Sequence, residues 1–562
     1  MIPRRDLLAG AAGLATLGAA ALRAAAQERL TEADLLGGEP FGQVTLLHVA
    51  DLHGQMLPMH FREASVNVGV GEGRGRPPFL TGAALRDHFR IPPGTPMAHA
   101  VSHESFETLA RRYGRMGGLD RIATLVRAIR ETRPGRTLLL DSGDTWQGGL
   151  VSLETRGMAM VEVMALLRPE AMTGHWEFTY GAGRVTELIE AAEAAGTAFL
   201  AGNVQDNEWN EDVFPASALF ERGGVAVAVI GQAFPYTPIA NPRWMIPDWS
   251  MGIQEEKLAR RVEEARAAGA EVVVLLSHNG FAVDRRLAAR VRGIDVILVG
   301  HTHDCTPQPI RVGDTLLVAS GAHGKFLTRL DLEVAGGRVS GVRHALIPVF
   351  SEAIRPDPEM RAAIARARAP HEARLARVVG RSATTLFRRG NINGTWDDLI
   401  CDALLAERDA EIALSPGFRW GPSLLADSPI TVEDIHAQTA ITYPAAWRME
   451  MTGAQLKDLL EDVCDNLFNP DPFYQQGGDM VRAGGLGFTI EVDRPAGRRI
   501  TDLRLLPGDE PLQASRRYVV AGWASVNEDV QGPPIWELLE RHIARLGTVA
   551  PVPNTAIRLS RE

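Results

Sequence analysis

The stretch VTLLHVADLHG, residues 44–54, decides the fold class. Val44 to Ala50 is a short, nearly continuous apolar run, which is typical of a buried β-strand. The run leads directly into Asp51 and His53, two residue types that bind metals. Because ligands of open α/β sheets gather at the carboxyl ends of the strands, we expect a functional site at this edge.

Further runs repeat this pattern along the chain. Short apolar runs end in polar segments at 137–140 before DSGD (141–144), at 272–276 before SHNG (277–280) and at 296–299 before GHTH (300–303). A fifth polar segment, GHWEF, occupies 174–178, and another apolar run lies at 225–230. Helical stretches rich in Ala, Arg and Glu separate the runs. This order predicts an α/β fold, and such continuous apolar strands favour sheets covered on both faces by helices.

The polar segments together supply two carboxylates and five imidazoles. These are Asp51, His53, Asp144, His175, His278, His301 and His303. Such a mixture of oxygen and nitrogen ligands suits Mn²⁺, Zn²⁺ or Fe²⁺ better than Ca²⁺ or Mg²⁺ alone. A carboxylate can bridge two cations about 3.5–4 Å apart. A single histidine at a strand end is usually structural, but five such segments in order predict two divalent metal ions, with Mn²⁺ favoured over Zn²⁺ and Fe²⁺.

Chain length and composition indicate more than one domain. With 562 residues the chain is too long for one hydrophobic core. We expect one domain over 42–350, a helical linker over 351–377 and a second domain over 378–562, with helices at 397–408 and 452–466 and strands at 488–492 and 518–521. Residues 60–118 form a long connection rich in Gly and Pro, which is expected to be a lid or a wall of the site.

Residues 1–26 have the pattern of an export signal. Arg4 and Arg5 precede an apolar run over 7–22, and three alanines at 24–26 offer a cleavage site. The arginine pair predicts a periplasmic protein exported by the twin-arginine route. An uncleaved membrane anchor is the alternative, but the run is shorter than the roughly 20 residues that a span needs.

The net charge limits the kinds of partner that the chain can bind, and the cysteine content limits its disulfides. The formal net charge of -10 argues against a nucleic-acid-binding surface, and no other stretch is long and apolar enough to span a membrane. Cys305, Cys401 and Cys464 allow at most one disulfide and match no metal or redox motif. We expect three reduced, mostly buried thiols.

The ordered motifs resemble those of the metallophosphoesterases: Asp-x-His, Gly-Asp, Gly-Asn-His-Glu, His and Gly-His-x-His. The chain is similar to their 5′-nucleotidase branch over nearly all of its length. This resemblance implies a four-layer N-terminal metallophosphoesterase domain, an α+β sandwich, followed by a C-terminal 5′-nucleotidase-type α/β domain for substrate binding. It also implies the ligand sets: Asp51, His53 and His303 for one metal, His278 and His301 for the other, Asp144 as the bridge, and His175 in place of the family's asparagine.

The third motif departs from the family where the chemistry depends on it. Trp176 stands in place of the catalytic histidine and Thr179 in place of its supporting aspartate. Neither side chain supplies a proton near neutral pH as imidazole does. This loss would slow the expulsion of an alkoxide, whereas a thiol with a pKa of about 8.5 leaves as the thiolate without prior protonation. The departure favours cleavage of an S–S bond over a P–O bond.

Five segments resemble the SoxB family of sulfate-releasing thiosulfohydrolases. They are GHWEFTYG (174–181), DLHGQM (51–56), NINGTW (391–396), SPGFRWG (415–421) and NPDPFYQQGGDMVR (469–482). The resemblance implies release of sulfate from a cysteine S-thiosulfonate on the carrier protein SoxYZ, whose arm would enter a narrow channel between the domains.

Three residues of the second domain are candidates for contact with the substrate. Arg419 occupies the place of an anion-binding arginine, and its guanidinium fork matches a sulfonate. Asp144, Trp176 and Arg419 are therefore the expected catalytic residues, with Arg419, Tyr474 and Arg482 lining the groove.

Two other functions remain open at this level. The first is a periplasmic 5′-nucleotidase or 2′,3′-cyclic-nucleotide phosphodiesterase, which would clamp a base between aromatic rings such as Phe473, Tyr474 or Phe488. The second is a metal-holding component of the Sox complex without turnover, against which the full ligand set argues.

Overall fold

The structure is a computed structural model that describes residues 30–506 and 508–561. The predicted export signal, residues 1–26, lies outside the described residues. Among the described helices, none combines the length and the apolar character that crossing a membrane requires.

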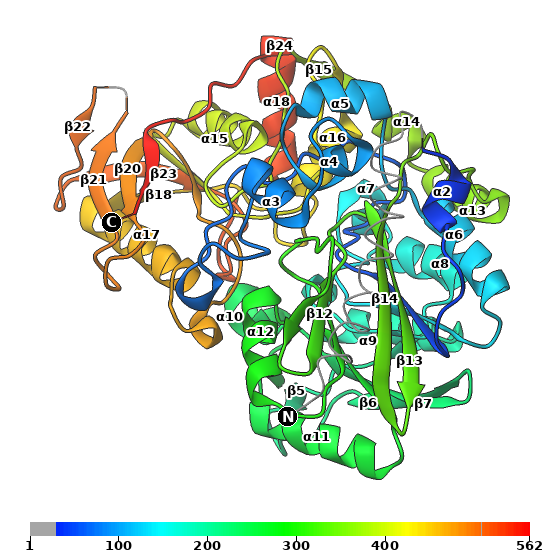
Figure 1. Ribbon diagram of the computed structural model, residues 1–562. Helices are drawn as coiled ribbons and strands as arrows, with labels where there is room; N and C mark the ends of the chain where they lie inside the picture. Colours follow the sequence, from blue (N-terminus) through cyan, green and yellow to red (C-terminus); the bar gives the residue numbers. More distant parts are fainter. Residues whose placement is uncertain (1–29, 507, 562) are drawn as a thin grey trace.

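Two six-stranded sheets form the N-terminal half of the molecule (Figure 1). The first has the order β14 (Arg338–Pro348), β13 (Phe326–Ala335), β1 (Val44–Val49), β2 (Thr137–Asp141), β3 (Ala171–Met172) and β4 (Ala198–Phe199). The second has the order β11 (Ile310–Val312), β12 (Thr315–Ala319), β10 (Val296–Val299), β9 (Val272–Ser277), β7 (Val225–Gln232) and β6 (Ser217–Arg222). In each sheet the strands that precede the predicted ligands are parallel neighbours, so their carboxyl ends share one edge.

The two sheets pack face to face, and helices cover their outer faces. Val44 and Leu46 of β1 lie in one core with Val272 and Val274 of β9. Leu47, the next residue of β1, lies in a different core, with residues of α6 (Leu119–Thr132), α8 (Met158–Leu167), α9 (Ala182–Ala194) and α13 (Pro358–Arg368). The outer face of the second sheet packs on α11 (Glu255–Ala267) and α12 (Phe281–Arg290). The domain is therefore the four-layer sandwich that the family resemblance implied.

The expectation of helices on both faces of each sheet is wrong. Central strands such as β9 and β10 are almost entirely apolar because one face meets the opposite sheet and the other meets helices, and both environments exclude water. Burial of one aliphatic side chain contributes about 1.5–3 kcal/mol whichever neighbour covers it. The apolar pattern therefore indicates that a strand is buried, but it does not indicate whether a sheet or a helix covers each face.

In the C-terminal half, the described residues form three smaller sheets and four helices of eight or more residues. The sheets have the orders β17 (Pro429–Thr431), β15 (Val378–Ser382), β24 (Thr548–Val549); β18 (Trp447–Thr452), β23 (Arg517–Gly522), β16 (Ile412–Ser415), β19 (Arg482–Gly484); and β22 (Glu510–Pro511), β21 (Ile500–Leu505), β20 (Leu486–Glu491), β25 (Ile557–Ser560). The helices are α15 (Thr395–Arg408), α16 (Val432–Thr439), α17 (Gly453–Leu467) and α18 (Ile535–Leu546). Between the halves, α13 and α14 (Glu372–Leu375) occupy the segment predicted as a helical linker.

The long connection over 60–118 joins the two halves. It carries α3 (Gly82–Phe89), α4 (Pro96–Val101) and α5 (Phe106–Tyr113), drawn in blue beside C-terminal elements in Figure 1. The backbone N–H of Ser423 donates to the His60 carbonyl at 2.7 Å, and the N–H of Val68 donates to Asn391 Oδ1 at 2.5 Å. These contacts make the connection a wall between the halves.

Candidate metal centre

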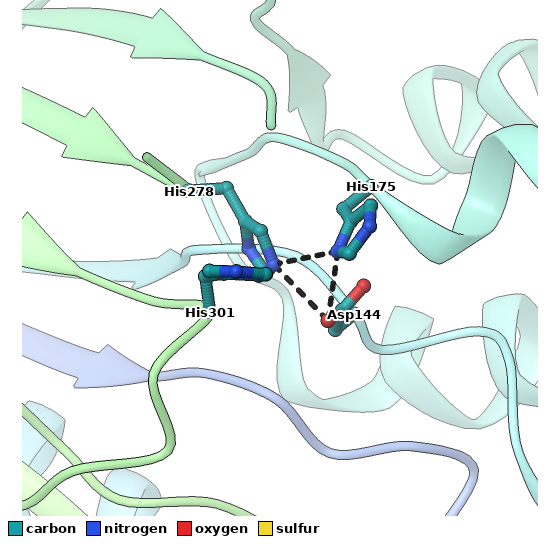
Figure 2. A group of neighbouring side chains, drawn as sticks. All are labelled: Asp144, His175, His278 and His301. Atoms are coloured by element: carbon teal, nitrogen blue, oxygen red, sulfur yellow. Dashed lines mark hydrogen bonds and ion pairs between the residues drawn. The ribbon is translucent and has the colours of Figure 1, made fainter. Parts of the chain in front are cut away.

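The five polar segments converge at one edge of the N-terminal domain. They follow β1, β2, β3, β9 and β10, so the segment at 174–178 also lies just beyond a strand, although its two-residue strand was too short to predict. Figure 2 shows Asp144, His175, His278 and His301 pointing toward one another from separate loops. The carboxyl ends of parallel strands place them there.

The seven predicted ligands form two groups that share one carboxylate. One group is Asp144, His175, His278 and His301, and the other is Asp51, His53, Asp144 and His303. Within each group the donor atoms all lie within 4.8 Å of one another, and all seven residues are buried. Asp144 belongs to both groups, as a bridging ligand must.

Distances around Asp144 match those of a coordination sphere. Its Oδ2 lies 3.0 Å from His278 Nε2, 3.3 Å from His175 Nδ1 and 3.6 Å from His53 Nε2. On the other side of the bridge, the Nε2 atoms of His53 and His303 are 3.1 Å apart. Ligands bound to one cation at about 2.0–2.2 Å are themselves separated by roughly 3 Å. The spacing is therefore compatible with one ion in each group.

Proton positions also favour cations at the centre. His278 Nδ1 donates to the Ser142 carbonyl at 2.5 Å, which leaves Nε2 facing the Asp144 carboxylate. Burial disfavours the charged form of His278, but Asp144, Asp51 and the Ser142 carbonyl together outweigh burial and raise the pKa of the ring to about 10. A divalent cation between Nε2 and the carboxylate would replace that proton.

Three candidate ligands each have a buried side-chain atom without a hydrogen bond. These atoms are Asp51 Oδ2, His301 Nε2 and His303 Nδ1. Burial raises the pKa of Asp51 well above its ordinary value and lowers the pKa of His301 well below its own. An unpaired buried polar group costs about 1–3 kcal/mol. Because cations would satisfy carboxylate and neutral imidazoles together, the donor set fits a pair of divalent ions.

Five of the seven ligands have left-handed backbone conformations. The φ angles are 54° at Asp51, 45° at His53, 56° at Asp144, 74° at His301 and 56° at His303. Such conformations are costly for residues with a Cβ and cluster at functional sites. Neighbouring loops stabilise them: the N–H of His53 donates to the Asp144 carbonyl at 2.7 Å, and the N–H of His301 donates to Asp51 Oδ1 at 2.9 Å.

Sequence reasoning missed Glu177, which holds two ligand loops together. This carboxylate has no exposed surface. It accepts backbone N–H groups from Asp144 at 3.3 Å, Thr145 at 2.7 Å, Trp146 at 3.1 Å and His175 at 2.8 Å. Its place beside Trp176 in the third motif was the available signal.

Trp176 supplies an apolar wall at the position for which the family resemblance implies a catalytic histidine. Its backbone N–H donates to Asp144 Oδ1 at 2.8 Å. Its indole is buried, lies parallel to Tyr443 at 6.2 Å and meets Phe418 edge-on at 5.0 Å. The Thr179 hydroxyl donates to the Trp176 carbonyl at 2.7 Å. Neither side chain offers a proton to a leaving group.

Arg419 lies between the metal centre and a pocket formed by both halves of the chain. Its guanidinium donates to Asp479 Oδ1 at 3.1 Å, to the His301 carbonyl at 3.2 Å and to the Gly478 carbonyl at 2.6 Å. The pocket is lined by Arg419 and His301 together with Asn67 of the long connection and Gln475 of the C-terminal half. This position allows Arg419 to contact an anion bound beside the metals.

Arg482 does not lie in this groove, contrary to our expectation. It has no exposed surface, and its guanidinium contacts Asp479 Oδ2 at 3.1 Å, Asp397 Oδ2 at 3.3 Å and the Gly390 carbonyl at 2.8 Å. Arg482 begins β19, the edge strand of its sheet, and its side chain is buried among these partners. Arg419 and Arg482 bind different oxygens of the same aspartate, Asp479.

Tyr474 also lies away from the pocket. Its side chain is 67% exposed, whereas its neighbours Gln475, Gly477 and Gly478 line the pocket. Gly477 has a φ of 79°, and a Cβ there would lie 2.1 Å from His301 Nε2. The backbone of this loop therefore lies against the site, and the Tyr474 ring points toward solvent.

The remaining predicted residues have structural places. Cys305, Cys401 and Cys464 are free and buried, as expected. Phe488 lies in the core, and neither it nor Phe473 or Tyr474 lines the pocket beside Arg419.

Comparison with known proteins agrees with this geometry. Residues 378–537 match the family described as 5′-nucleotidase, C-terminal domain. The 5′-nucleotidases of Rattus norvegicus and Homo sapiens are each 24% identical over 460 residues, covering 72% of this chain and 76% of theirs. A 5′-nucleotidase precursor from Thermus thermophilus shares the fold, with a TM-score of 0.72 at 21% identity over 92% of this chain and 99% of its own. Fold and relatives define a two-domain protein of the 5′-nucleotidase-like metallophosphoesterase class, whose members are hydrolases.

One solved structure narrows the class. The sulfate thiohydrolase SoxB of Thermus thermophilus is 37% identical, with a TM-score of 0.90, over 93% of this chain and 98% of its own. The chain belongs to the SoxB family within the 5′-nucleotidase-like metallophosphoesterase superfamily.

Proposed function

We propose that this chain is a two-metal hydrolase that releases sulfate from a cysteine S-thiosulfonate on the carrier protein SoxYZ. The observation that carries the proposal is the pair of ligand groups sharing Asp144 beside Trp176, where an acid is absent. The similarity to a sulfate thiohydrolase supports it.

Each residue near the centre has a distinct task in the proposed reaction. Bound divalent ions, most simply Mn²⁺, would ionise water and neutralise charge on the sulfonate oxygens. Arg419 binds one of those oxygens through its guanidinium. The wall of Trp176, Phe418 and Tyr443 keeps bulk water from the leaving sulfur. That sulfur departs as an anion without a proton donor, since its conjugate acid has a pKa near that of a thiol, about 8.5.

The pocket beside Arg419 is the proposed path of the carrier's cysteine arm. It lies between the two halves and borders His301, so a narrow peptide that entered it would bring its terminal sulfonate to the ligand groups. We further propose that the chain works in the periplasm after export by the twin-arginine route.

Sulfate release from a carrier tests this function. The manganese-loaded protein is mixed with SoxYZ carrying a cysteine S-thiosulfonate, and separately with AMP and with a 2′,3′-cyclic nucleotide. We expect rapid sulfate release and little phosphate release. Faster turnover of a nucleotide would support the nucleotidase alternative, and absence of all turnover would support a metal-holding component of the Sox complex.

Replacement of Trp176 tests the leaving-group argument. Trp176→His is expected to reduce sulfate release, because the parallel packing on Tyr443 is lost. Phosphatase activity should stay weak, because Thr179 cannot orient the new imidazole as an aspartate would. Trp176→Phe is the control for lost indole volume. Strong phosphatase activity in Trp176→His with undiminished sulfate release would refute the argument.

A further inference from the structure

His323 lies beside the metal centre but belongs to neither ligand group. It occupies the turn between β12 and β13 and is 2% exposed. Its ring centroid lies 5.7 Å from that of His53 and 6.3 Å from that of His303. The two groups of candidate ligands found among the described residues omit it. A buried imidazole so close to the site without a ligand role calls for another explanation.

Two hydrogen bonds connect His323 to both halves of the molecule. Its backbone N–H donates to the Asp51 carbonyl at 2.9 Å. Its Nε2 accepts the backbone N–H of Gly421 at 3.1 Å. One residue thus joins the loop that carries Asp51 and His53 to a loop of the C-terminal domain. Because Nε2 is the acceptor, any proton on the neutral ring lies on Nδ1.

The loop held by His323 carries residues that face the site. Gly421 directly follows Arg419 and Trp420. Arg419 donates to the His301 carbonyl at 3.2 Å, and the Trp420 ring centroid lies 5.9 Å from that of His53. The loop therefore meets the N-terminal domain through the Arg419 guanidinium, the Trp420 ring and the backbone N–H groups of Gly421 and Ser423. Of the two backbone contacts, the bond of Gly421 to His323 is the nearer to Arg419, two residues away along the chain.

We propose that His323 is a positioning residue that holds Arg419 at the substrate's anionic group by anchoring Gly421. This inference rests on the proposed role of Arg419. A neighbouring hydrogen bond can fix the position of a side chain to within about 0.5 Å. Such a side chain binds its ligand more tightly than one that loses conformational freedom each time the ligand binds. His323 does not contact the substrate itself. Its replacement is therefore expected to change substrate binding through Arg419 and to change the mobility of the loop.

Two substitutions separate the hydrogen bond from the volume of the ring. His323→Leu removes the acceptor, whereas His323→Gln keeps an oxygen that can reach the Gly421 N–H. Loss of one such bond is expected to lower kcat/KM for sulfate release about tenfold, mainly through KM. His323→Gln should stay within about twofold of the parent protein. Both variants should retain the parent's metal content.

Hydrogen exchange gives a readout that does not depend on activity. The amide of Gly421 should exchange faster in His323→Leu and at the parent rate in His323→Gln. If the leucine variant does not fold, His323→Asn replaces it, because asparagine tolerates the left-handed φ of 55° and is too short to reach Gly421. Unchanged exchange in the variant that lacks the acceptor, or loss of metal from it, would overturn the proposal.

A double-mutant cycle with Arg419→Met distinguishes a wrong role for His323 from a wrong role for Arg419. If His323 acts through Arg419, removing its acceptor in the Arg419→Met background should change kcat/KM by less than about twofold. A full tenfold loss in that background would overturn the positioning role. An Arg419→Met protein with the parent's KM would instead refute the proposed role of Arg419 itself.

Discussion

The N-terminal and C-terminal sides of the site differ in how their side chains are placed. On the N-terminal side, the segments that carry the candidate ligands begin where strands end. The strand order of each sheet and the packing of the two sheets bring Asp51, Asp144 and His278 together. On the C-terminal side, Arg419 and Arg482 sit on either side of Asp479, and only Arg419 borders the pocket. The fold topology positions the candidate ligands of the N-terminal side. Ion pairs in a buried network position the two arginines of the C-terminal side.

The largest expected effect follows from removing the shared carboxylate. Asp144→Asn should lower sulfate release on the order of a thousandfold and reduce metal content, because both ligand groups lose a member. Asp87→Asn, an exposed carboxylate on α3, is the matched control. Metal analysis and sulfate release are measured on the same samples. Full activity in Asp144→Asn would remove the basis for a topologically defined centre.

Arg482 should affect stability more than chemistry. Arg482→Met leaves Asp397 and Asp479 without a shared partner in the core. Breaking a buried ion pair costs about 3–5 kcal/mol. Urea unfolding should show this loss, while KM in the folded fraction changes little. A stable Arg482→Met variant with a strongly raised KM would indicate that Arg482 does line the substrate groove.

Arg419 should show the opposite behaviour. Arg419→Met removes the guanidinium beside His301, and kcat/KM for the sulfonate should fall about 10- to 100-fold, the range of a hydrogen bond to a charged group. Stability should change less than in Arg482→Met, because the Arg419 side chain is partly exposed at 13%. Equal stability losses in the two variants would erase the distinction between them.

Tyr474 provides the smallest effect. Tyr474→Ala removes an exposed ring that does not line the pocket, so stability should change by about 0.5 kcal/mol or less. Release of sulfate from a small thiosulfonate should be unchanged. A clear loss of turnover with this small substrate would show that the ring reaches the site.

The sequence predicted the strands and the ligand set better than the layers around them. β10 has the predicted bounds and β1 ends one residue before the predicted run, because a continuous apolar run between polar segments favours a buried strand. The four-layer arrangement came from the family resemblance, since burial against a sheet and burial against helices leave the same apolar pattern.

Other features of the site depend on tertiary contacts that spacing does not reveal. Glu177 binds four backbone amides of two loops. The left-handed backbone at Asp51 and His53 is stabilised by hydrogen bonds of their N–H groups to the carbonyls of Gly143 and Asp144. The partners of Arg482 are equally invisible, because Asp397 lies on a separate helix, α15. Local pattern identifies which residue types carry the chemistry, and the fold decides which of them reach the site.

The central claim is that seven side chains hold two divalent ions with Asp144 between them. A crystal grown with manganese, with data collected at the manganese absorption edge, tests this claim directly. We expect two anomalous peaks about 3.5–4 Å apart, one within each ligand group and both in contact with Asp144. A single peak, or two peaks of which only one contacts Asp144, would contradict it.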